Sequence, residues 1–259
     1  MESILEQIVS KSRGDLVKRK AELPYSKLEQ KLDSLPPVVD FRAALTAPGM
    51  RVIAELKAAS PSKGIIRQPL EVETLAVELE RAGAAALSVL TEPNFFLGGL
   101  KNLEKARQAV KLPLLRKDFI YDEYQILEAR VAGADAVLLI AAMLTPVEYR
   151  RLRQFAESLN LAVLSEAHTL DEIAMLLDNG ASIIGVNARN LSTFVTKLDL
   201  VAELLGAIPG NLVRVSESAL KSAADLKAMK QAGADAFLIG ETLMRAPSPG
   251  EKLCELIAE

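Results

Sequence analysis

The chain has 259 residues, half of them hydrophobic, so it can bury a substantial core and has the size at which an α/β barrel forms one domain. Its 31 basic and 34 acidic residues give a net charge of −3 without a run of like charges, which argues against a nucleic-acid partner. With one cysteine and one histidine, an internal disulfide and a Cys/His zinc cluster are excluded, and no metal is expected.

The sequence also argues against a membrane partner. Its first twenty residues lack the apolar stretch and small-residue cleavage site of a signal peptide. The longest apolar run, from Ala136 to Leu144, is far shorter than the ~20 residues needed to cross a bilayer. We therefore expect a cytoplasmic protein.

The first 48 residues are predicted to be helical. Helical patterns cover about 3–33 and 40–46, with Pro36 and Pro37 between them. We interpret residues 1–48 as a helical extension that packs on a barrel domain of residues 49–259.

From residue 51 onward, apolar segments alternate with helical patterns. Four segments each contain a helix end, a glycine and an apolar strand, as expected when glycine ends a helix and the strand is buried on both faces: 81–90, 131–140, 178–186 and 231–240. Four further strands are predicted at 51–56, 113–117, 161–166 and 212–217.

Eight strand–helix units in about 210 residues favour a single (β/α)8 TIM barrel within the α/β class. An open doubly wound sheet is the alternative, because local patterns cannot show closure. That fold more often carries a glycine fingerprint, and this chain has neither GxGxxG nor GxxxxGK[ST].

Polar residues gather at the ends of the predicted strands, which in this fold form the active-site face. Strand alternation places Ile53, Glu55 and Lys57 on one face, where charges need partners or a function. Each residue taken singly also fits a solvated loop lysine or a helix-capping glutamate. Together they predict a site for a polar small molecule: Glu55, Lys57, Lys117, Glu166, Asn187, Arg189, Glu217, Ser218 and Gly240.

This set of residues suits acid–base chemistry. Burial or the neighbouring cation Lys57 would lower the pKa of Lys117, although nearby carboxylates would oppose the shift. Apolar neighbours would raise the pKa of Glu166. His168, two residues past Glu166, is expected to be structural.

Two loops are candidates for binding a phosphate. Segments 216–222 and 239–244 follow the last two predicted strands, where this fold often holds an anion. Gly240 would let a ligand approach backbone N–H groups closely; the alternative is an ordinary turn glycine.

Several motifs carry a resemblance to a known family. From about residue 40 to 246 the chain resembles indole-3-glycerol phosphate synthases in the segments IAELKAASPSKG, LSVLTEPNFFLGG, PLLRKDFIYDEYQI, GADAVLLIAAML, GVNARNL and FLIGETLMR. The resemblance implies a carboxy-lyase of tryptophan biosynthesis. Such an enzyme closes the ring of 1-(o-carboxyphenylamino)-1-deoxyribulose 5-phosphate with loss of carbon dioxide and water, and needs no cofactor.

The resemblance also implies a role for each site residue. Lys117 is the general acid, and Glu166 and Glu55 transfer protons in the dehydration. Lys57 binds a substrate anion and acts as a second acid, and Asn187 orients hydroxyl groups. The remaining residues form the walls of the pocket: Ser60, Arg189, Glu217 and Ser218 line it, Phe96, Phe119 and Leu138 face the aromatic ring, and Ser218, Ala219, Gly240 and Glu241 hold the phosphate.

The chain departs from the family pattern at three places. Ala219 replaces a glycine, Ala188 an asparagine, and Ser165 and Ala167 replace branched apolar residues beside Glu166. Two alternatives remain open. One is another phosphosugar barrel enzyme of the same pathway, such as an isomerase, and the other is a non-catalytic or engineered barrel. We expect a phosphorylated small molecule as partner and a monomer or weak homodimer.

Overall fold

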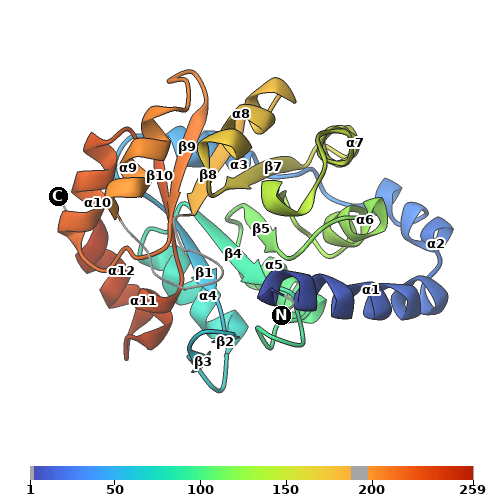
Figure 1. The fold of residues 1–259 in the computed structure, drawn as a ribbon. Coiled ribbons are helices and arrows are strands. Elements are labelled where there is room, and N and C mark those ends of the chain that lie inside the picture. The colour runs from blue at the N-terminus through green and yellow to red at the C-terminus, as the bar shows by residue number, and fades with distance from the viewer. Residues whose placement is uncertain (1–2, 188–197, 259) are drawn as a thin grey trace.

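The computed structural model describes residues 3–187 and 198–258 and shows a closed barrel of parallel strands (Figure 1). The last strand pairs with the first, with Ile53 opposite Leu238, which closes the sheet. The predicted TIM barrel is thus confirmed, and the open sheet is excluded. The barrel strands are β1 (Arg51–Leu56), β4 (Ala86–Leu90), β5 (Leu114–Lys117), β6 (Ala136–Ile140), β7 (Ala162–Ala167), β8 (Ile183–Asn187), β9 (Val213–Glu217) and β10 (Ala236–Ile239).

Helices surround the barrel. As predicted, a glycine with positive φ follows the helix before four of the strands. Gly83, Gly133, Gly180 and Gly233 have φ values of 92°, 91°, 80° and 105°. The surrounding helices are α4 (Val72–Arg81), α5 (Leu100–Ala109), α6 (Glu123–Val131), α7 (Pro146–Ser158), α8 (Leu170–Asp178), α9 (Leu198–Gly206), α10 (Ala223–Gln231), α11 (Glu241–Arg245) and α12 (Pro249–Ile257), with the 3-10 turn η2 (Ala141–Met143) after β6.

The core has two layers, which follow from strand alternation. In β1, Val52 and Leu56 pack under the helices, whereas Ile53 lies in the barrel interior. Helix α3 (Phe41–Thr46) precedes β1, and its Phe41 and Leu45 join the interior cluster. They close the N-terminal end of the barrel, so the site is left to the opposite end.

The N-terminal extension is divided more finely than predicted. The expected pattern over 3–33 is split into α1 (Ile4–Glu22), α2 (Tyr25–Glu29) and a 3-10 turn η1 (Leu32–Ser34). The break falls at Leu23, which is extended with φ −130° because the residue before a proline, here Pro24, avoids the helical region.

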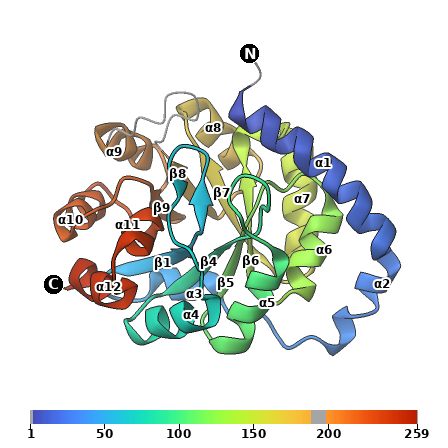
Figure 2. The ribbon, with the colours of Figure 1, turned by 90° about the horizontal axis from the view of Figure 1, so that it is seen from below.

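Helix α1 runs alongside α6 (Figure 2). Arg19 donates two hydrogen bonds to Glu128, at 2.8 and 3.3 Å, and the Tyr124 hydroxyl donates to the Leu23 carbonyl at 2.6 Å. Glu128 also faces the buried Arg116 of β5 at 3.4 Å. Buried, paired charges therefore attach α1 to the strand that carries Lys117.

A short hairpin of β2 (Ala59–Ser60) and β3 (Gly64–Ile65) extends from the chain after β1. The hairpin was not predicted, because two-residue strands leave no periodic pattern in the sequence. No described helix is both long and apolar enough to span a bilayer.

Candidate active site

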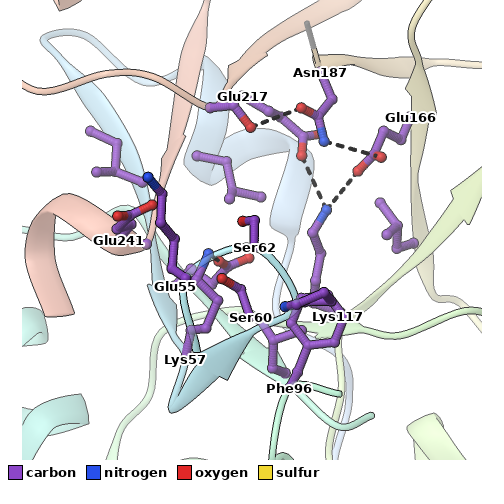
Figure 3. Close-up of a pocket in the computed structure, with 18 of the residues that line it drawn as sticks. Glu55, Lys57, Ser60, Ser62, Phe96, Lys117, Glu166, Asn187, Glu217 and Glu241 are labelled. Carbon is purple, nitrogen blue, oxygen red and sulfur yellow. Dashed lines mark hydrogen bonds and ion pairs between the residues drawn. The ribbon is translucent and has the colours of Figure 1, made fainter. Parts of the chain in front are cut away.

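A pocket of about 590 Å³ opens at the C-terminal end of the barrel (Figure 3). The structure brings together here all the predicted site residues that it describes: Glu55, Lys57, Ser60, Phe96, Lys117, Phe119, Leu138, Glu166, Asn187, Glu217, Ser218, Ala219, Gly240 and Glu241. Arg189 and Ala188 lie outside the described residues.

Lys117, at the end of β5, points its ammonium between two carboxylates (Figure 3). Its Nζ donates to Glu166 at the end of β7, at 2.6 Å, and to Glu217 at the end of β9, at 3.1 Å. Asn187 of β8 donates to the other Glu166 oxygen at 3.2 Å. Four strands thus hold one charged cluster in the pocket.

The predicted direction of the Lys117 pKa is wrong. Burial by itself lowers the pKa of Lys117, but Glu166, Glu217 and Glu55 together outweigh burial and raise it. Lys57 does not act as a repelling neighbour, because its own Nζ forms an ion pair with Glu55 at 2.6 Å. Lys117 is therefore fully protonated near neutral pH.

The predicted direction of the Glu166 pKa is wrong as well. Burial raises this pKa, as expected, but the nearby cations Lys117 and His168 lower it by more. Strand alternation also turns Ser165 away from the pocket, where it hydrogen-bonds the Tyr149 hydroxyl at 2.7 Å. Glu166 is ionised in this arrangement.

Glu217 behaves in the opposite way. Burial and the charge of Glu166 raise its pKa to about 8 against the pull of Lys117. Its Oε1 has no hydrogen-bond partner among the described residues. Gly185 makes room for this oxygen, because a Cβ there would lie 2.1 Å from it. A proton can therefore remain on Glu217 near neutral pH.

Gly240 has a similar function beside Glu55. A Cβ at Gly240 would lie 2.3 Å from the Glu55 Oε1, so the glycine admits this carboxylate into the barrel. Its φ of −118° is accessible to other residues. Close approach of Glu55, rather than backbone conformation, therefore requires glycine at this position.

Apolar side chains form another wall of the pocket. The rings of Phe96 and Phe119 lie 5.9 Å apart between centroids with a 38° tilt. Glu92 holds the backbone that carries the first ring, because it accepts hydrogen bonds from the backbone N–H groups of Phe95 and Phe96 at 2.7 and 3.0 Å. Helix α1 adds a part of this wall that was not predicted from the sequence, formed by Ile4, Leu5 and Ile8.

The expected phosphate-binding end of the pocket has an unusual backbone. Ser218 and Ala219 adopt positive φ values of 68° and 59°, in the region that strongly favours glycine. The Ser218 hydroxyl donates to Asn187 at 2.8 Å. On the other side, Glu241 begins α11 and pairs with Arg245 at 3.0 Å. In the hairpin, Ser60 is buried and its hydroxyl has no described partner.

His168 was expected to be structural, and the structure places it beside Glu166. Its Nε2 lies 3.3 Å from the Glu166 Oε1. The sequence shows only that His168 follows Glu166 by two residues, just past the end of β7, which does not indicate where the ring points. Among the described residues, no group of three His, Cys, Asp or Glu side chains is arranged to hold a metal ion.

Comparison with known proteins identifies the family. The family model for indole-3-glycerol phosphate synthase matches residues 5–256. The chain belongs to this family. It is 48% identical to the indole-3-glycerol phosphate synthase of Koribacter versatilis, across 99% of this chain and 100% of the relative, and 43% identical to that of Dehalococcoides mccartyi, across 98% and 100%.

Solved structures resemble the fold at low sequence identity. A 3-hexulose-6-phosphate synthase from Salmonella typhimurium has a TM-score of 0.64 at 12% identity, covering 80% of this chain and 96% of its own. KGPDC from Streptococcus mutans has 0.62 at 18%, covering 81% and 96%. These matches support the TIM barrel alone.

Family membership confirms the expected enzyme class. The chain is a lyase that releases carbon dioxide, an indole-3-glycerol phosphate synthase of tryptophan biosynthesis, and its substrate is a small phosphorylated molecule. The alternatives of a different pathway enzyme and of a non-catalytic barrel are not favoured by any observation at the site.

Proposed function

We propose that this pocket closes the indole ring of 1-(o-carboxyphenylamino)-1-deoxyribulose 5-phosphate, with Lys117 as the proton donor. The observation that carries the proposal is the ammonium of Lys117, held between Glu166 and Glu217 at the bottom of a pocket that has an aromatic wall. The raised pKa of Lys117 keeps it charged, which is the state that a general acid requires.

Ring closure needs a proton on the ribulose carbonyl oxygen. As the carboxyl-bearing ring carbon attacks the carbonyl carbon, Lys117 protonates the oxygen and the carbonyl π electrons become its O–H pair. Loss of carbon dioxide returns an electron pair to the ring. Glu217, 3.1 Å from Nζ and with a pKa of about 8, can return a proton to the amine.

Dehydration then requires a base and an acid. Glu166 is ionised and can accept the proton that leaves the substrate, while a cationic side chain protonates the departing hydroxyl group. Lys57, paired with Glu55 at 2.6 Å, is the second acid, and Asn187 orients substrate hydroxyls. Ser60 and Glu217 line the described part of the pocket, and the binding role expected for Arg189 stays a prediction. From the sequence, both Glu55 and Glu166 are candidates for the proton transfers of the dehydration. The geometry favours Glu166, because it contacts Lys117 directly.

The two ends of the substrate fit opposite walls. Phe96, Phe119 and Leu138 suit the aromatic ring, because offset aromatic contacts and apolar burial stabilise it. Backbone N–H groups near Ser218, Ala219, Gly240 and Glu241 suit the phosphate. No step in this scheme needs a metal or an organic cofactor.

The direct test is to incubate the enzyme with the carboxyphenylamino substrate and follow indole fluorescence together with carbon dioxide release. Equal amounts of both products support the proposal. Isomerisation of phosphoribosyl anthranilate without indole formation would instead favour the isomerase alternative.

Three further expectations accompany this proposal. We infer a cytoplasmic location, a monomer or weak homodimer, and a boundary near residue 48 between the helical extension and the barrel. Light scattering during size-exclusion chromatography tests the oligomeric state. Limited proteolysis tests the boundary, since cleavage between α3 and β1 would release the two predicted parts.

A further inference from the structure

His168 stands between two carboxylates just outside the pocket. Its Nε2 lies 3.3 Å from the Glu166 Oε1 and its Nδ1 lies 3.5 Å from the Glu172 Oε2. Neither nitrogen has hydrogen-bond geometry with a described residue, so the two contacts are ion pairs when the imidazole is protonated. The side chain is only 14% exposed. The carboxylates Glu166 and Glu172 and this imidazole form a chain that leads from the pocket to α8.

Glu172 is itself held in place. It is the third residue of α8, and its N–H donates to the Thr169 hydroxyl at 3.2 Å. Its Oε2 accepts a hydrogen bond from the backbone N–H of His168 at 2.6 Å. The carboxylate therefore fixes both the backbone and the ring of His168.

The remaining surroundings of His168 add little charge. The 3-10 turn η2, which packs on both β7 and α8, contributes only Ala141–Met143 and no charged group. Behind Glu166 stand Asn187 of β8 and Lys117 of β5, and Lys117 in turn contacts Glu217 of β9. Among the described residues, the two carboxylates are the charged groups that contact the ring.

We propose that His168 is a positioning residue: its imidazolium, anchored by Glu172, holds Glu166 ionised and oriented for proton transfer with the substrate. Burial lowers the pKa of His168, but the two carboxylates outweigh burial and raise it to about 10. Lys117 and His168 in turn lower the pKa of Glu166. The inference rests on the proposed role of Glu166 in catalysis.

The first test uses the fact that the chain has one histidine. In the untagged full chain, the ring Cε1–H signal in a ¹³C–¹H correlation spectrum reports this imidazole alone. We expect little titration between pH 6 and 8.5 and a midpoint near 10. Glu172→Gln should lower the midpoint by about 1 unit or more. A wild-type midpoint near the ordinary value of about 6.5 would overturn the proposal.

Glu148→Gln is the matched control. Glu148 occupies the same position in α7 that Glu172 has in α8, three residues after a threonine that caps the helix, but it contacts Thr145 and no histidine in the described structure. This variant should leave the midpoint unchanged. A shift as large as that of Glu172→Gln would mean that helix capping, and not the contact with His168, causes the effect.

The second test measures kcat against pH. In His168→Gln and Glu172→Gln, the acidic limb of the profile should move to higher pH by about 1 unit, with KM changed less. A uniform fall of kcat at every pH would indicate a merely structural role. If Glu166→Gln keeps its kcat, the proposed function of Glu166 fails while the NMR result stands; a normal His168 midpoint with an inactive Glu166→Gln fails this inference alone.

Discussion

At the scale of residues, the number of cations that contact each carboxylate decides whether that carboxylate is protonated. Glu166 and Glu217 both contact the Lys117 ammonium, yet one pKa is lowered and the other is raised to about 8. The difference arises because Glu166 has a second cation, His168, and Glu217 does not have one among its described contacts. One carboxylate is thus prepared to accept a proton and the other to keep one.

Lys117→Met tests the proton donor. The variant should fold, because methionine fills similar space, but kcat should fall by ~10²–10⁴-fold, the usual contribution of a general acid. Indole fluorescence measures the rate and circular dichroism the fold. Lys101→Met, an exposed lysine of α5, is the matched control and should keep full activity. Near-normal turnover by a folded Lys117→Met protein would contradict the assignment.

Glu166→Gln tests the base. Glutamine keeps the size and can still accept from Lys117, but it cannot take up a proton. We therefore expect kcat to fall by ~10²-fold or more with little change in KM. Steady-state kinetics separates the two constants. If KM alone changes, Glu166 binds substrate and Glu55 becomes the next candidate for the proton transfer.

Ala219→Gly tests the strained turn at the expected phosphate site. Ala219 has a φ of 59°, so glycine relieves about 1 kcal/mol of backbone strain and frees the N–H to approach the phosphate. KM should fall several-fold while kcat changes less, because the phosphate is remote from the reacting carbons. Greater freedom of the unfolded chain offsets the relief, so Tm should change little.

Ala47→Gly is the control for this turn. Ala47 has an ordinary φ of −63°, so glycine brings only the entropic loss and Tm should decrease, with KM unchanged. If Ala219→Gly leaves KM unchanged or raises it, the phosphate is not bound at this turn.

At the scale of elements, the barrel strands could be predicted from the sequence, whereas the β2–β3 hairpin and the contact of α1 with the pocket could not. Glycine followed by an apolar run marks local structure, so the strands near Gly83 and Gly133 could be placed. The alternation of Ile53 and Glu55 also placed the charges on the correct face. The β2–β3 hairpin and the part of α1 that lines the pocket depend on contacts between distant segments, which no local pattern contains.

The same distinction applies to the candidate site. The residue types at the strand ends identified Lys117 and Glu166, because parallel strands bring their ends together. The direction of each pKa shift could not be predicted, since it depends on whether burial or the nearest charges dominate. His168 illustrates the limit, because its contact with Glu166 depends on its side-chain orientation.

Helix α1 provides the prediction at this scale. Glu128 is 5% exposed in its side chain and contacts both Arg19 and Arg116. Glu128→Gln removes the carboxylate that pairs with Arg19 and one of the two that pair with Arg116, since Asp118 remains 2.9 Å from Arg116. We expect a loss of about 2 to 3 kcal/mol in the free energy of unfolding. Arg19→Gln should cost less, because Arg116 still pairs with Glu128. Urea unfolding measures both.

Both variants should also raise KM, because a loosened α1 no longer holds Ile4 and Leu5 against the pocket. Lys18→Gln, an exposed lysine on the same helix, is the control. If Arg19→Gln lowers the free energy of unfolding more than Glu128→Gln does, the contact between Arg116 and Glu128 does not stabilise the fold as expected.

At the scale of the whole molecule, the site couples stability to pH. Glu217 has its pKa raised to about 8 and His168 to about 10, so the folded protein holds protons that the unfolded chain, with values near 4.5 and 6.5, has released. Each contribution is complete below the unfolded pKa and is lost as the pH rises through the folded one. Glu166 has the opposite sign, and its contribution is lost as the pH falls below about 4.5.

The free energy of unfolding should therefore decrease between pH 5 and 10. Each group contributes a slope of at most about 1.4 kcal/mol per pH unit, the value for one proton. Glu217→Gln should remove the part between about 4.5 and 8, and His168→Gln the part between about 6.5 and 10. Urea unfolding at pH 5, 7 and 9 measures the slopes, with Glu148→Gln as a control that keeps both. If the slope between pH 7 and 9 is the same in His168→Gln as in the wild type, the imidazole holds no extra proton in the fold.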